Sequence, residues 1–382
     1  MDGLTRTPSD ITRYQVFALT AGSIIGVGVL VLPRWIVERA GSGAALAMGI
    51  GSLLALGLAW LWSKAMEQYP TVGPRAVART AGVGHAARVV LAVALGGFYL
   101  VAAAMVAREF GEVVVSAILT QTPLEVTVLL LLGLSAYMVR QSIQAQMRVF
   151  ELLLPLMVFP GVLIAFFSLQ NARALNLLPV WGNHPSGLWS ASLIALGSFE
   201  GMMVSAMVVT IPGRPRRLVG PMLWAVVVSL FVYILVTTAT LAVFGPQETR
   251  ELMWPTLELA RITSLPGNIL ERIEALFLAV WVAAVFTTLA GALLTVAVIA
   301  ARVMRLANHR EVVPWLLPIL YVIAMVPRNI QALYAFLILW VEIGLVVFVL
   351  IPVCMWVVGW ASPIRRRAPG RSAAAGSGGE GG

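Results

Sequence analysis

The stretch GSIIGVGVLVLP, residues 22–33, is the most informative part of this chain about its fold. Three glycines, Gly22, Gly26 and Gly28, interrupt an apolar run that ends in Pro33. Glycine lets the backbone leave helical dihedral angles, and proline removes a backbone donor. Within a membrane, non-helical backbone is tolerated only where protein or a water-filled cavity satisfies the freed N–H and C=O groups. The stretch therefore predicts a broken membrane helix whose backbone can meet a ligand.

The whole chain has the composition of an integral membrane protein. Its 382 residues are 60% hydrophobic and 11% charged, with a mean hydropathy of +0.92. Apolar runs of roughly 20 residues, the length that crosses about 30 Å of hydrocarbon as a helix, recur up to residue 360. The first run is followed by another without a small-residue cleavage site, so no removable signal peptide is expected. We predict an all-α membrane protein.

The apolar runs predict ten transmembrane helices. They cover residues 14–33, 42–62, 89–118, 124–139, 149–169, 188–211, 218–244, 273–301, 312–326 and 331–359. Ten spans divide into five and five, and because five is odd the second half must run opposite to the first. This is the inverted-repeat arrangement of many transporters, in which spans one and six occupy equivalent positions.

Charge and loop composition predict how the chain is oriented and divided. Most of the 26 Lys+Arg residues fall on one side of the ten-span topology, which places both termini in the cytoplasm. For the same reason the net charge of +9 indicates topology and not nucleic-acid binding. Residues 1–362 are expected to form one permease-like domain and residues 363–382 a disordered cytoplasmic tail. The loop 245–272 is expected to hold an amphipathic segment on the membrane surface.

Span six carries a second break, ALGSFEG at residues 195–201, with Gly201 and the carboxylate of Glu200 near mid-membrane. A carboxylate at that depth is costly and marks a functional site by default. Gly-interrupted segments at matching positions of two halves indicate a binding site. The alternatives are that Gly22 and Gly26 form a GxxxG packing face, and that Glu200 lies at the membrane interface.

Other polar residues supply weaker candidates. The N-terminus of a half-helix carries a partial positive charge and free N–H groups, which suit a carboxylate such as that of an amino acid. Tyr99 in span three and Thr287, with its neighbour Thr288, in span eight are candidates to face a central cavity, although hydroxyls satisfied within or between helices are the commoner case. Arg108 and Glu112 are expected to form an i,i+4 ion pair, with a structural role for the cluster that includes Glu109.

Nothing in the sequence indicates catalysis. The histidines His85, His184 and His309 lie in different loops, Cys354 is the only cysteine, and there is no HExxH motif or phosphate-binding Gly-rich loop. We therefore expect no enzyme, no metal site and no cofactor.

Several segments in order carry a resemblance to a known family. They are DITRYQVFALTAGSIIGVGVLVLP at 10–33, REFGEVV at 108–114, TPLEV at 122–126, VRQSIQAQMRVFELLLP at 139–155, NLLPVWG at 176–182, WPTLELAR at 254–261 and ERIEALFLAVWVAAVF at 271–286. Up to about residue 360 the chain resembles the spore germination permease family. These are the B subunits of nutrient germinant receptors of endospore-forming bacteria, and they are similar to amino acid/polyamine/organocation transporters.

The resemblance implies a ten-helix, inverted-repeat transporter fold in the inner membrane of the spore, among membrane lipids. It implies a subunit that senses a small germinant, often an amino acid, beside a receptor A subunit and a lipoprotein C subunit. The implied ligand site comprises Gly22, Ser23, Gly26 and Gly28 of span one and Phe199, Glu200 and Gly201 of span six. The alternatives are a transporter of amino acids or organic cations, proton-coupled through Glu200, and a purely structural membrane subunit.

Overall fold

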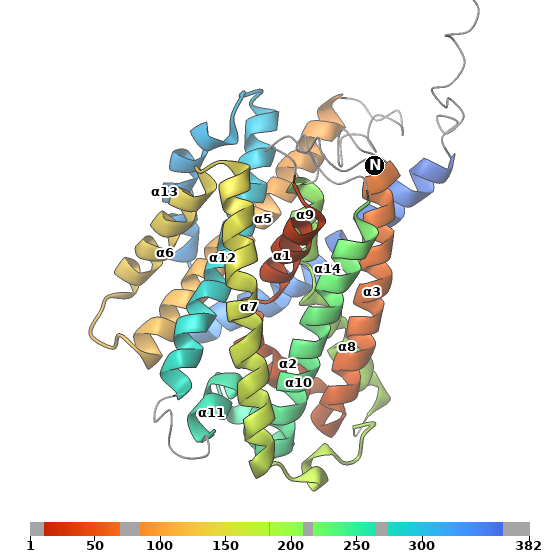
Figure 1. The fold of residues 1–382 in the computed structure, drawn as a ribbon, viewed down its shortest axis with the longest axis vertical. Coiled ribbons are helices and arrows are strands. Elements are labelled where there is room, and N and C mark those ends of the chain that lie inside the picture. Colours follow the sequence, from red (N-terminus) through yellow and green to blue (C-terminus); the bar gives the residue numbers. More distant parts are fainter. Residues whose placement is uncertain (1–10, 69–84, 183, 209–216, 264–272, 362–382) are drawn as a thin grey trace, which may run out of the picture.

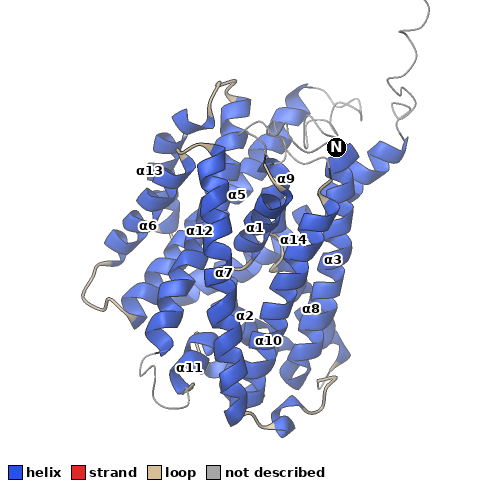
Figure 2. Ribbon diagram, viewed as in Figure 1, coloured by secondary structure: helices blue, strands red, loops and turns tan. Residues whose placement is uncertain are grey.

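The computed structural model describes residues 11–68, 85–182, 184–208, 217–263 and 273–361. Within these ranges every regular element is a helix (Figures 1 and 2). The α-helices are α1 (Arg13–Ile24), α2 (Gly28–Ala40), α3 (Ala44–Gln68), α5 (His85–Ala117), α6 (Leu124–Val139), α7 (Ile143–Ser168), α8 (Pro185–Gly197), α9 (Met202–Val208), α10 (Val219–Glu251), α11 (Pro255–Ile262), α12 (Ile273–Val303), α13 (Val313–Ala324) and α14 (Ile330–Ala361). Short 3-10 turns are η1 (Gly41–Gly43), η2 (Leu169–Asn171), η3 (Ala174–Leu177) and η4 (His309–Glu311).

Seven helical segments in the described part of the chain are long and apolar enough to cross a membrane. One of them, Gly28–Glu67, joins α2, η1 and α3, while α6 and α13 are shorter apolar helices. The described α-helices other than α11 fall on the ten predicted runs, and the run 124–139 is α6 residue for residue. The all-helical membrane fold is thereby confirmed. The number of crossings and the inverted repeat stay predictions.

The first broken span begins at a capping box. The Thr12 hydroxyl accepts a hydrogen bond from the Gln15 backbone N–H at 3.1 Å, and the Gln15 side-chain oxygen accepts one from the Thr12 N–H at 3.0 Å. This reciprocal pair satisfies two donors that a helix start otherwise leaves free. The start of α1 is therefore set by local sequence.

The helices differ in how deeply they lie in the bundle. In the most apolar window of α12, 83% of the residues are buried, against 17% for α14. Figure 1 shows α12 and α1 among the other helices, with α6 and α13 at one edge. Large apolar side chains such as Leu130, Leu152 and Trp224 are exposed on the outside. Exposed apolar surface of this extent is typical of helices that face lipid.

The segment after α10 differs from its predicted form. α10 continues to Glu251 through a kink at Gly245, whose φ of +74° is in the left-handed region. α11 follows, and five of its eight residues are buried: Pro255, Thr256, Leu257, Leu259 and Ala260. The helix is amphipathic, as expected, but its apolar face packs inward and is not simply laid on a surface. The rest of the predicted loop, 264–272, and the predicted tail, 363–382, lie outside the described residues.

Candidate functional site

The first predicted break is present. α1 ends at Ile24 and α2 begins at Gly28, and Ile25 between them has extended backbone, with φ −77° and ψ 99°. In the described chain, none of the backbone hydrogen bonds uses the N–H groups of residues 26–28. These three donors are at the N-terminal end of α2, where the helix dipole is positive.

Hydroxyl groups from other helices satisfy the carbonyls that the first break releases. The Gly22 carbonyl accepts from the Thr287 hydroxyl at 2.9 Å and from the Thr288 hydroxyl at 3.3 Å. The Ile24 carbonyl accepts from the Tyr233 hydroxyl at 2.7 Å. The break is thus held open by α10 and α12, as buried carbonyls require partners.

The carbonyl that Pro33 leaves without a donor is also bound by a hydroxyl from another helix. Pro33 lies inside α2 and has no N–H, so the carbonyl of Val29, four residues earlier, lacks its helical donor. The Thr256 hydroxyl on α11 donates to this carbonyl at 2.7 Å. α11 therefore caps a defect that Pro33 creates in α2.

The second predicted break is also present, but it is tighter than the first. α8 ends at Gly197 and α9 begins at Met202. Between them the chain makes turns held by i,i+3 hydrogen bonds, from Glu200 N–H to the Gly197 carbonyl at 3.0 Å and from Met202 N–H to the Phe199 carbonyl at 3.0 Å. The turns interrupt the helix and expose Glu200 to the space beside α2 without unwinding the backbone fully.

The two breaks are in contact. A Cβ built on Gly201 would lie 2.9 Å from the Ile24 backbone nitrogen and closer still to the Ser23 carbonyl. On α12, a Cβ at Gly291 would lie 2.8 Å from the Ser23 hydroxyl. Glycine at these positions lets backbones approach to distances that a methyl group would forbid. Segments almost 180 residues apart in the sequence thus meet at one point.

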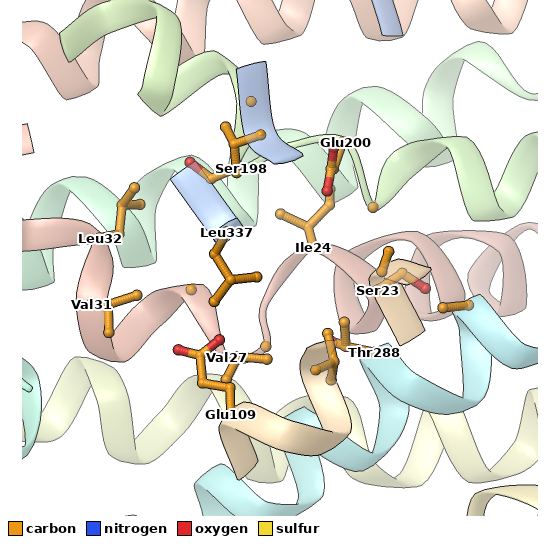
Figure 3. A pocket seen from close by; sticks show the side chains of 18 of the residues that line it. Ser23, Ile24, Val27, Val31, Leu32, Glu109, Ser198, Glu200, Thr288 and Leu337 are labelled. Carbon is orange, nitrogen blue, oxygen red and sulfur yellow. The ribbon is translucent and has the colours of Figure 1, made fainter. Parts of the chain in front are cut away.

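A cavity of about 150 Å³ lies beside this contact (Figure 3). Six of the predicted site residues line it: Ser23, Gly26, Gly28, Tyr99, Glu200 and Gly201. Gly22, Phe199 and Thr287 are outside its wall, and Thr288 lines it. Phe199 is fully buried and packs edge-on against Tyr233, with 5.6 Å between the ring centres. The ligand-binding roles of all these residues stay predictions.

Several polar atoms of the cavity wall have no partner. Within the described part of the chain, the hydroxyls of Ser23 and Tyr99 and one carboxylate oxygen each of Glu109 and Glu200 are buried without a hydrogen bond. Ser23, Tyr99 and Glu109 are 3%, 4% and 4% exposed. Buried polar groups are almost always hydrogen-bonded, so four such atoms on residues that line one cavity mark a region where the described chain leaves polar groups without partners.

Glu109 is the functional candidate that the sequence interpretation missed. The predicted ion pair of Arg108 with Glu112 is confirmed at 2.7 Å, and Arg108 also donates to the Ala324 carbonyl. Glu109 has no part in that pair, and its side chain lines the cavity. Glu109 points away from the ion pair because successive helical residues point about 100° apart, and the structural role predicted for it stays a prediction.

A spacing signal for Glu109 was nevertheless present. The cavity-lining residues of α5 are Tyr99, Ala102, Val106 and Glu109. Their spacing of three, four and three is that of one helix face. Once Tyr99 is placed toward a cavity, this periodicity places Glu109 there too.

The cavity wall has an unbalanced set of charges. Glu109 and Glu200 both line the cavity, and none of the described residues that line it is Lys, Arg or His. The backbone N–H groups at the start of α2 are its positive end. The arrangement can hold a ligand that carries both a cationic and an anionic group.

The sequence profile of the spore germination proteins matches residues 10–333 of this chain, which is most of its length. The chain belongs to the spore germination protein family. Two relatives cover nearly the same length. The spore germination protein YndE of Bacillus subtilis (strain 168) is 24% identical over 322 residues, or 84% of this chain and 88% of YndE. The spore germination protein GerLB of Bacillus cereus is 25% identical over 346 residues, or 88% and 91%.

A solved structure shares the fold of this family member. It is Mhp1, a nucleobase-cation-symport-1 family transporter, in a closed conformation with bromovinylhydantoin bound. The TM-score is 0.61 at 14% identity, over 87% of this chain and 77% of Mhp1. The likeness shows a transporter fold. The family and the seven apolar helices together identify an integral membrane protein of endospore-forming bacteria.

Proposed function

We propose that this chain is a germinant-sensing membrane subunit that binds a small ligand, an amino acid, in the cavity between the two helix breaks. The observation that carries the proposal is the backbone contact of Gly201 with Ser23 and Ile24. It brings the free N–H groups of α2 and the carboxylate of Glu200 to the same cavity.

The chemistry of an amino acid matches these two ends. Its carboxylate would accept from the N–H groups of residues 26–28, and its ammonium group would pair with Glu200. The apolar wall would contact the side chain. A ligand that bridges the two breaks binds one arrangement of the half-helices better than another, and so shifts the conformational equilibrium.

The setting of this subunit is part of the proposal. Membership of the spore germination family supports a position in the inner membrane of the spore, beside an A subunit and a lipoprotein C subunit. The bias of Lys and Arg supports cytoplasmic termini. In that setting the ligand-induced shift would be passed to the partner subunits.

A thermal-shift screen of the detergent-purified chain tests the binding step. Amino acids, nucleosides and sugars would be compared on the wild type, on Glu200→Gln and on Glu125→Gln, which changes an exposed carboxylate on α6. We expect one ligand class to raise the melting temperature saturably, with the effect weakened in Glu200→Gln alone. If no ligand raises it, or if both variants respond like the wild type, the proposed site is wrong.

The similarity to Mhp1 favours a second candidate, a transporter of amino acids or organic cations that is proton-coupled through Glu200. An uptake assay in proteoliposomes loaded with buffer at different internal pH distinguishes the transporter from the sensor. Uptake of the bound ligand that depends on the pH gradient and is lost in Glu200→Gln would establish the transporter. Saturable binding without uptake would favour the sensor.

A further inference from the structure

The cavity carries one acid more than an amino acid with an apolar side chain requires. Glu200 enters it from the α8–α9 break and Glu109 from α5. Neither is in a salt bridge with a described basic residue, and each has a buried oxygen without a hydrogen bond. Arg108, the cation nearest in sequence to Glu109, is engaged by Glu112 at 2.7 Å.

An unpaired carboxylate in a buried site is costly, because it loses its hydration without gaining a partner. Intramembrane acids accordingly pair with another group or face a polar cavity. The described wall provides no cation for either carboxylate. When Glu109 and Glu200 are ionised, their charge partners must therefore come from what occupies the cavity.

We propose that the cavity selects a small molecule with two amino groups separated by a short alkyl chain, one paired with Glu200 and the other with Glu109. This inference rests on the proposed function and names the ligand class of the same site. Figure 3 shows the two carboxylates entering from different sides, with Ile24, Val27 and Leu337 drawn between them. A dication with an apolar middle matches that order of charge and apolar surface.

The unpartnered hydroxyls fit the same ligand. An ammonium group donates three hydrogen bonds, and one carboxylate does not satisfy all of them. Tyr99 and Ser23 line the same cavity, and their hydroxyls have no hydrogen-bond partner among the described residues. The cavity of about 150 Å³ is about ten times the space that one water needs, which suits a ligand of about ten non-hydrogen atoms.

Two chemical sources supply such a dication, the α,ω-diamines and the dibasic amino acids. Both present two amino groups, and the amino acids add a carboxylate for the N–H groups of residues 26–28. The shared feature is the second amino group. It is tested by compounds that differ in that group alone.

Isothermal titration of the detergent-purified full chain provides the test. L-lysine would be compared with L-norleucine, and 1,5-diaminopentane with 1-aminopentane, since each pair differs only by the second amino group. We expect the diamino member of at least one pair to bind at least tenfold more tightly. A preference for lysine over diaminopentane would assign the α2 N–H groups to a carboxylate, and the reverse would assign the ligand to the simple diamines.

Substitutions show which carboxylate binds the second amino group. In Glu109→Gln we expect the difference within each pair to fall to less than threefold, while binding of the monoamino compound is retained. Glu125→Gln, on the exposed start of α6, should keep the wild-type difference. If Glu109→Gln does not fold, Glu109→Asp retains the charge on a shorter side chain and should weaken the diamino compounds selectively.

The outcomes separate this inference from the proposed function. Two results would overturn the proposed pairing of a second amino group with Glu109 and leave a small-ligand site in place. One is that monoamino compounds bind as tightly as their diamino partners, and the other is that the affinity difference within each pair survives in Glu109→Gln. Binding of only neutral ligands would do the same. If no compound of any class binds, the proposed function fails together with the inference.

Discussion

At the scale of single residues, the role of each glycine depends on what a side chain would meet. Gly49 and Gly57 on α3 have open space around them. Gly201 abuts the backbone of Ser23 and Ile24, and Gly26 abuts the side chain of Thr288. The sequence shows only that these residues are glycines. Their neighbours decide which of them permits a close approach and which is merely a weak helix former.

Gly201→Ala is expected to destabilise the protein. The added methyl would strike the Ser23 carbonyl, and backbone cannot rotate away as a side chain can, so the cost should be about 1–3 kcal/mol. The melting temperature of the purified chain measures it. Gly49→Ala is the matched control and should be neutral or raise the melting temperature, since alanine is the better helix former. Equal melting temperatures for Gly201→Ala and wild type would contradict the contact between the breaks.

At the scale of elements, each broken helix is completed by groups from other helices. The carbonyls released at the end of α1 are bound by hydroxyls of α10 and α12, and the carbonyl released by Pro33 is bound by α11. A broken helix in a membrane therefore depends on its neighbours for hydrogen bonds that an intact helix makes by itself. This dependence makes the breaks sensitive to substitutions in distant parts of the chain.

Thr256→Val tests the cap on α2. Valine has nearly the shape of threonine but no hydroxyl, so the buried Val29 carbonyl loses its donor at a cost of about 1–3 kcal/mol. Thr240→Val is the control, because the Thr240 hydroxyl donates to the Val236 carbonyl, which also has a donor within its own helix. Thermal denaturation of both variants should show the larger loss for Thr256→Val. A loss no larger than that of the control would show that α11 does not stabilise α2.

A histidine outside the spans links two other elements. His309 in η4 contacts the Val139 carbonyl at the end of α6, with 3.1 Å between Nε2 and the oxygen. Burial lowers its pKa below the ordinary value, and the neighbouring Arg310 acts in the same direction. The folded state therefore binds a proton on this group less readily than the unfolded state.

Stability should consequently fall on acidification. The contribution of His309 is complete above about pH 6.5, the unfolded pKa, and is lost as the pH falls below that value through the lower folded pKa. Melting temperatures measured between pH 8 and pH 5 should show less of this loss in His309→Asn than in the wild type. His184→Asn, at an exposed position, should retain the full loss. Identical pH profiles for all three proteins would contradict the assignment.

At the scale of the whole molecule, the helices differ in whether they are buried among other helices or exposed on the outside. α12 is surrounded by other helices and contributes to the cap of the first break, whereas most of α14 faces outward. Apolar residues cover both kinds of helix, because lipid and protein interior are similarly apolar. Hydropathy alone therefore shows which segments are helices in the membrane and not which of them form the centre.

The predicted orientation can be checked by labelling. In a Cys354→Ser background, Gln121→Cys after α5 and Arg305→Cys after α12 would be treated with a membrane-impermeant maleimide in intact cells and after lysis. The ten-span topology places residue 121 outside and residue 305 in the cytoplasm, so only Gln121→Cys should react in intact cells. Labelling of both or of Arg305→Cys alone would contradict the predicted spans or their orientation.

The helical membrane class, the positions of both breaks and the pair Arg108–Glu112 could be predicted from the sequence, because each follows from local composition and spacing along one segment. The packing of distant helices was needed to learn that Gly201 meets Ser23 and that Glu109 joins Glu200 at one cavity. It also showed that Thr287 and Thr288 both donate to the Gly22 carbonyl, while only Thr288 lines the cavity. Adjacent residues of a helix point in different directions, and which of them faces a cavity depends on helices far away in the sequence.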